Sequence, residues 1–87
     1  MSTRADDVKS SASEAIQDSA KLNAYIEALA GASRRNRQNA AAVIAQVAKE
    51  DVNLIAPFGN EIVDALNRPE AQTRWEVLDA LCELVAV

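Results

Sequence analysis

The feature of this sequence that most constrains its fold is a similarity of the chain to itself at an offset of 37 residues. Arg37 and Arg74 differ by 74 − 37 = 37 positions. At the same offset, apolar residues align with apolar residues on both sides of the arginines: Ala40 with Val77, Ala41 with Leu78, Ile44 with Leu81, Val47 with Leu84, and earlier in the chain Tyr25 with Ile62, Ile26 with Val63, Ala28 with Ala65, and Leu29 with Leu66. Repeats of this length are typical of stacked helical units. We therefore expect the core to form between neighbouring copies of one unit.

The centre of the chain, residues 33–68, predicts two antiparallel helices. Apolar residues recur at steps of three and four up to Ala48, which is the helical period, and Ser33 is a suitable N-cap. The pattern breaks at residues 49–53 and resumes from Leu54 to Leu66, with Pro57 in the first turn, where proline is tolerated. A connection this short places the two helices antiparallel.

Three further helices flank this pair. Residues 1–18 predict a first helix with a thin apolar stripe and several serines. We expect this helix to act as a polar cap, and the alternative is a partly frayed end. A second helix follows Asp18 or Ser19, and we expect Gly31 to end it in the left-handed conformation. A last helix is predicted from about Pro69 to Ala86.

The run from Asn67 to Leu81, NRPEAQTRWEVLDAL, resembles the signature between HEAT repeats: a polar or acidic turn, a proline, an arginine, and a helix rich in alanine and leucine. Residues 54–58, LIAPF, resemble the proline-bearing start of the second HEAT helix, and residues 37–41, RQNAA, repeat the arginine–alanine part. The resemblance covers roughly Leu22 to the C-terminus. It departs at the turn aspartate that commonly faces the arginine, which is Asn67 in one copy and is missing near Gly31 in the other.

The resemblance implies an all-α fold, a short right-handed HEAT-like α-solenoid of about five helices, with two helical hairpins and one unpaired helix in a single domain of residues 1–87. A closed four-helix bundle is the competing arrangement, because short loops permit it too. The last helix ends in LVAV without the polar capping face that solenoid ends normally carry. We expect either a fragment of a longer repeat array, which we favour, or a second molecule that covers this end.

Composition excludes several classes of function. The formal net charge of −4 disfavours a chain-wide affinity for nucleic acid or acidic membranes. The absence of histidine removes the commonest general base, the serine and cysteine triads, and histidine metal sites. The polar N-terminus does not resemble a signal peptide, and no segment approaches the length of a membrane span. We expect a cytoplasmic protein with no cofactor and no metal.

The arginines permit two interpretations. Arg34, Arg35 and Arg37 form the only basic cluster and lie in the first turn of a helix, where the helix dipole disfavours cations. We expect pairing with nearby carboxylates, such as Asp6, Asp7, Glu27 or Asp64, and the alternative is a contact with phosphate or nucleic acid. The resemblance implies a structural role for Arg37 and Arg74, in which each points into an inter-repeat groove and binds turn carbonyls or a carboxylate.

A small acidic groove is the first candidate binding site. The second helices of the repeats share a polar side, formed by Asn23, Glu27, Asn60, Glu61 and Asp64. In HEAT solenoids these helices line the concave face, so the resemblance implies a concave acidic surface here. The alternatives are a solvated helix face and a docking surface for a basic segment of a protein partner.

The last helix is the second candidate. We expect Trp75 to cover the edge of the preceding helix pair, and an exposed Trp75 would instead be a binding anchor. Cys82 is expected to be buried and inert. Leu84, Val85 and Val87 form an apolar ridge that could support a homodimer through this helix.

The function that agrees best with these features is a noncatalytic protein–protein interaction scaffold that presents a HEAT-like concave face. One alternative is a nucleic-acid-binding or repair module that uses Arg34, Arg35 and Arg37. Another is a structural oligomer formed through the C-terminal helix. No constellation of residues indicates an enzyme.

Overall fold

The chain forms an all-α structure, seen in a computed structural model that describes residues 4–86. Within this range there are five α-helices and no strands: α1 (Arg4–Gln17), α2 (Ser19–Ala28), α3 (Arg34–Asp51), α4 (Gly59–Asp64) and α5 (Ala71–Val85). Three 3₁₀ turns, η1 (Val52–Leu54), η2 (Ala56–Phe58) and η3 (Ala65–Asn67), flank α4. The all-α fold class and the number of helices are as predicted.

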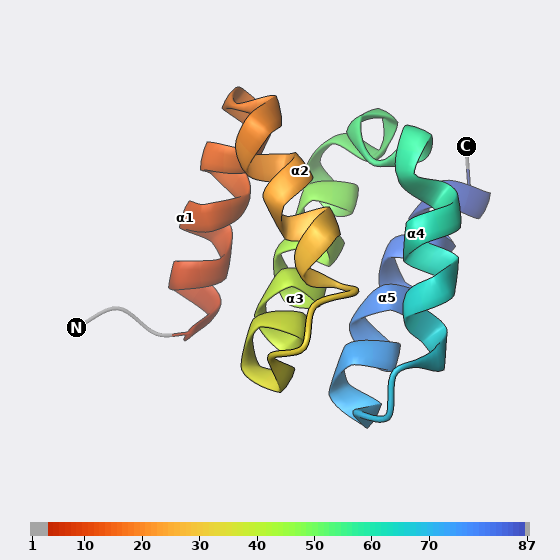
Figure 1. Ribbon diagram of the computed structural model, residues 1–87. Helices are drawn as coiled ribbons and strands as arrows, with labels where there is room; N and C mark the ends of the chain where they lie inside the picture. Colours follow the sequence, from red (N-terminus) through yellow and green to blue (C-terminus); the bar gives the residue numbers. More distant parts are fainter. Residues whose placement is uncertain (1–3, 87) are drawn as a thin grey trace.

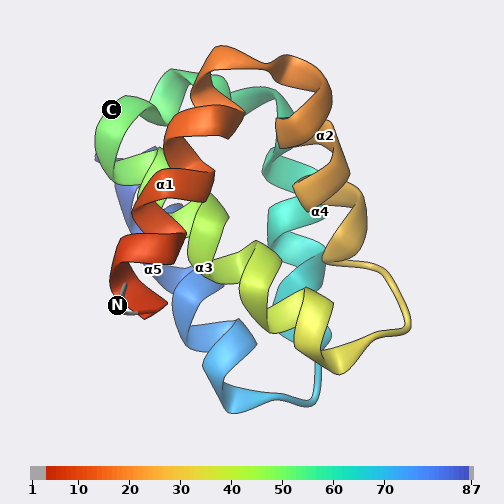
Figure 2. The same ribbon diagram turned by 90° about the vertical axis from the view of Figure 1, so that its left-hand side faces the viewer.

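The helices form two layers. Figure 2 shows α1, α3 and α5 on one side of the molecule, and α2 and α4 on the other. In Figure 1, α1, α3 and α5 run upward, whereas α2 and α4 run downward in the other layer. Helix α3 is the centre of its layer, because it packs against both α1 and α5. The helices that carry Arg37 and Arg74 therefore lie side by side and run in the same direction.

Two helices begin at the residues that the sequence indicated. The Asp18 side chain accepts a hydrogen bond from the Ala20 amide at 3.0 Å, and the Ser33 hydroxyl accepts one from the Asn36 amide at 3.2 Å. Each satisfies an amide that has no partner within its own helix. Both N-caps are confirmed. The sequence also offers Thr3 and Asp6 as a capping pair for the first helix, and Thr3 lies outside the described residues.

The end of α2 differs from the prediction for Gly31. No glycine within residues 4–86 has a positive φ angle. Instead, the amides of Leu29, Ala30 and Gly31 each bond to the carbonyl three residues earlier, at 3.1 to 3.2 Å. The helix thus ends by tightening into 3₁₀ geometry, which satisfies late carbonyls without a left-handed residue.

The fourth helix is shorter than expected. Helix α3 continues to Asp51, and α4 begins only at Gly59, after η1 and η2. Asp51 makes no side-chain cap, and Pro57 lies in η2 rather than in the first turn of a long helix. Proline lacks the amide that a regular helix would use, so the segment bends through short 3₁₀ turns before α4 can form.

The core is built from alanine and branched aliphatic residues, and α3 supplies the largest share. Seven of its residues are buried: Ala40, Ala41, Val43, Ile44, Ala45, Val47 and Ala48. From α5, the buried residues are Thr73, Val77 and Ala80. Leu78, which aligns with the buried Ala41 at the offset of 37, has instead an exposed fraction of 48%. Helix α5 is therefore rotated so that Ala80, rather than Leu78, faces the core.

Candidate functional site

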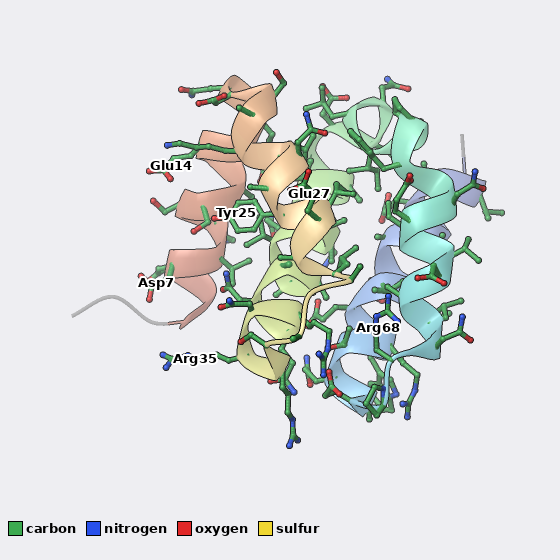
Figure 3. All side chains as sticks on the ribbon, in the orientation of Figure 1. Asp7, Glu14, Tyr25, Glu27, Arg35 and Arg68 are labelled. Carbon is green, nitrogen blue, oxygen red and sulfur yellow. The ribbon has the colours of Figure 1, made fainter. Side chains whose placement is uncertain are left out.

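A groove between α2 and α4 brings together most of the predicted acidic residues. Asn23 and Glu27 reach it from α2, and Glu61 and Asp64 reach it from α4. Its cavity volume is about 430 Å³. Asn60 is exposed on α4 but does not line this groove. In Figure 3, Glu27 lies on the part of α2 that is turned toward α4.

The floor of the groove is apolar. Ile26 and Leu29 are buried at its base, and Phe58 from η2 is half-buried beside them. Apolar atoms at the base and carboxylates at the rim are the usual arrangement of a site that buries an aliphatic stem and orients a polar group.

The carboxylates of the groove differ in their pairing. Asp64 accepts from Arg68 Nη2 at 2.9 Å, one helical turn away. Glu27 and Glu61 are exposed and form no ion pair within residues 4–86. Glu27 on α2 and Glu61 on α4 therefore face the groove from opposite helices, and among residues 4–86 neither carboxylate is paired with a cation.

The three arginines of the predicted cluster differ in exposure and in hydrogen bonding. Arg34 and Arg35 are exposed. Arg37 is not available for a phosphate, because its Nε donates to Glu70 Oε1 at 2.8 Å and its Nη1 donates to the Gly31 carbonyl at 2.9 Å. Arg37 pairs with a carboxylate as expected, but the partner is Glu70, just before α5, and not one of the carboxylates given as examples.

The Arg37–Glu70 pair is well shielded from solvent. The exposed fractions of the two side chains are 13% and 5%. The hydrogen bond from Arg37, assisted by the charges of Arg37 and Arg34, holds the pKa of the Glu70 carboxyl below its ordinary value. The same hydrogen bond raises the pKa of the Arg37 guanidinium. The pair is thus a fully ionised link between the start of α3 and the start of α5.

Two further arginine contacts complete the link between the turns. Arg74 Nη1 donates to the carbonyls of Arg68 and Pro69, both at 2.8 Å. Arg68 Nε donates to the Leu29 carbonyl at 2.9 Å, which joins the end of α4 to the end of α2 (Figure 3). Sequence reasoning missed Arg68 and Glu70. The sequence did contain one signal for Arg68. At the repeat offset it corresponds to Gly31, because 68 − 37 = 31.

The exposed face of α5 corrects two expectations. Trp75 does not cover the preceding helices, because its exposed fraction is 70%, and Cys82 is exposed rather than buried. The predicted apolar ridge is also divided: Val85 is 84% exposed, whereas Leu84 is half-buried against the core. Val87 lies outside the described residues.

Comparisons of the chain with protein-family models, with curated proteins and with solved structures found no match. Across residues 4–86, none of the helices combines the length and the apolar character needed to cross a membrane. The same residues contain no group of three or more acidic or cysteine side chains that could hold a metal ion. The candidate sites are therefore the α2–α4 groove and the exposed face of α5.

Proposed function

We propose that this chain is a HEAT-like α-solenoid that acts as a noncatalytic scaffold for protein–protein interaction. In this proposal the α2–α4 groove is the concave face and binds a basic segment of a partner protein. The observation that carries the proposal is the pair of unpaired carboxylates, Glu27 and Glu61, on opposite rims of an apolar groove.

The arrangement of the helices supports the solenoid part of the proposal. A stacked repeat requires equivalent helices to be parallel neighbours, whereas neighbours in an up-and-down bundle alternate in direction. Helices α1, α3 and α5 run in the same direction in one layer (Figures 1 and 2). The contacts of Arg37 and Arg74 with the turns before their helices support the same repeat.

The chemistry of the groove supports a basic partner. A lysine or arginine can lay its aliphatic stem on Leu29 and Phe58 while its charged head lies between Glu27 and Glu61. The carboxylate of Asp64 already receives Arg68, so the two glutamates are the charges available to a ligand.

A binding titration tests the proposal. The probe is a fluorescein-labelled peptide in which arginine and leucine alternate, and the readout is fluorescence polarisation. The double variant Glu27→Gln/Glu61→Gln should bind it at least tenfold more weakly, because an ionic hydrogen bond contributes roughly 1.5–3 kcal/mol. The matched control, Glu14→Gln/Glu50→Gln, removes the same charge from exposed positions outside the groove and should bind like the wild type. Equal affinity of the two double variants would reject the groove as the binding site.

A further inference from the structure

The two arginines of the repeat are held in the same way by the turns before their helices. Arg37 Nη1 donates to the Gly31 carbonyl, and Arg74 Nη1 donates to the Arg68 carbonyl. Gly31 and Arg68 are themselves 68 − 31 = 37 positions apart. The internal repeat therefore extends to individual hydrogen bonds. The contacts of α3 can then be compared, position by position, with those of α5, and α3 serves as the template in this comparison.

The template shows one contact that α5 does not make. Arg37 Nε donates to Glu70, the N-cap residue of α5, which packs against α3. Within residues 4–86, Arg74 has no carboxylate partner, and its hydrogen bonds go to two main-chain carbonyls. A guanidinium carries five donors and is suited to a carboxylate in addition to these carbonyls.

The face of α3 that carries Arg37 is covered by α5. Residues four apart on a helix lie on one face, so Ala41, Ala45 and Ala48 share the side of Arg37, which reaches the start of α5. All three alanines are buried.

Among residues 4–86, no helix covers the equivalent face of α5. At the offset of 37, the three alanines correspond to Leu78, Cys82 and Val85, and these are exposed. Trp75 lies next to them with 70% of its surface exposed. The spacing of Trp75, Leu78, Cys82 and Val85 is three, four and three residues, which is the seam by which one helix packs along another. We call these four residues the α5 seam.

A second copy of this chain would not supply the missing contact. If two α5 helices paired antiparallel through the seam, Arg74 would lie beside the C-terminal half of the opposite helix. The residues on that edge are Leu81 and Val85, which are apolar. The occupant that satisfies both the seam and Arg74 is a helix parallel to α5 with a carboxylate at its start, in the relation that α5 has to α3.

We propose that α5 is a docking surface for a helix of another protein that runs parallel to α5. This helix places a glutamate or aspartate at its N-cap against Arg74 and an apolar stripe against the α5 seam. The surface is separate from the α2–α4 groove, so a scaffold of this design can hold two partners at once.

A display selection tests this proposal without a known partner. The probe is a phage-displayed library of single amphipathic helical peptides with a randomised N-cap, selected against the whole chain. The expected result is enrichment of peptides with glutamate or aspartate at the N-cap. Their binding should shift the emission of Trp75, the only tryptophan, to shorter wavelength.

Variants of the chain locate the bound peptide. Arg74→Gln should weaken the enriched peptides roughly tenfold, as expected for a lost charge-assisted hydrogen bond. The control Arg35→Gln removes the same charge from an exposed position on α3 and should have no effect. Because Arg74 also bonds to its own turn, Leu78→Glu provides a second variant at a half-exposed position, and it should abolish binding while helical content is retained.

Three outcomes would overturn the proposal. They are a failure to enrich any helical peptide, an N-cap without acidic preference, and enriched peptides that still bind Leu78→Glu. Binding that persists in Leu78→Glu but is lost in Glu27→Gln/Glu61→Gln would assign the peptides to the α2–α4 groove instead.

Discussion

Arg37 and Glu70 are 33 residues apart in the sequence, yet Arg37 Nε lies 2.8 Å from Glu70 Oε1. The pair joins the first turn of α3 to the N-cap of α5, and both side chains are nearly enclosed. It therefore fixes the register between the two helices that have the most extensive mutual packing.

Arg37→Gln should destabilise the fold more than the same change at Arg34 or Arg35, the other two arginines of α3. The change leaves the Glu70 carboxylate shielded from water without its cation, which is costly even where the intact pair contributes little. Thermal unfolding followed by circular dichroism measures the effect. Arg35→Gln is the matched control, and the double variant Arg37→Gln/Glu70→Gln should recover part of the loss. An Arg37→Gln melting temperature equal to that of Arg35→Gln would contradict this role.

Stability should fall with acidification because of the same pair. The pKa of Glu70 is lowered in the folded state, so its contribution is fully present above the ordinary glutamate pKa of about 4.3 and is lost as the pH falls through the lower, folded value. Urea unfolding at neutral pH and at several values below about pH 4 measures this. The difference in unfolding free energy between wild type and Glu70→Gln should shrink toward low pH. A difference that stays constant with pH would show that the carboxylate is not the source.

Thr73→Val should stabilise the chain. Thr73 is fully buried, and its hydroxyl oxygen has no hydrogen-bond partner among residues 4–86. Replacing the hydroxyl with a methyl group keeps the shape of the β-branched side chain and removes an unsatisfied polar atom, which costs about 1–3 kcal/mol. Chemical denaturation should show an increase within that range. The control is Thr73→Ala, which removes the same hydroxyl but leaves a cavity and should not stabilise.

The sequence predicted those features that are decided locally. Asp18 and Ser33 cap their helices through amides two or three residues away, so the local sequence was sufficient.

Helix α5 shows why other features were missed. It carries two stripes with helical spacing, one through Thr73, Val77, Ala80 and Leu84 and the other the α5 seam. The seam is the more hydrophobic of the two, yet the stripe of smaller residues faces the core, because closely packed α3 offers alanines there.

The candidate site shows the same division. Four of the five predicted polar residues line the α2–α4 groove, since helical period and repeat offset together place them on one face. The contacts Arg37–Glu70 and Arg68–Leu29 join turns that are 33 and 39 residues apart, and no local pattern specifies which donor reaches which acceptor. Such pairs depend on how the helices pack against one another.

The destabilisation caused by core substitutions should follow the depth of burial of each residue. Ile44 is fully buried at the centre of α3, whereas Leu81 is half-buried on α5. Ile44→Ala should cost about 2–5 kcal/mol, and Leu81→Ala should cost less, because part of its side chain already contacts water. Denaturant titration of both variants gives the order. An equal loss would mean that a second molecule covers Leu81 in solution.

Neighbouring residues at the end of α5 should respond differently to charge. Leu84 packs against the core and is half-buried, whereas Val85 has 84% of its surface exposed. Val85→Lys should leave the free energy of unfolding within about 0.5 kcal/mol of the wild type, as is usual for surface substitutions. Leu84→Glu should destabilise the chain by burying part of a charge without a partner.

Sedimentation across a concentration series, run on the same variants, separates folding from association. If the wild type forms dimers through the α5 seam, Val85→Lys should shift it to monomer while its helical content is unchanged. A wild type that sediments as a monomer at all concentrations would reject self-association and leave the seam to a helix of another protein.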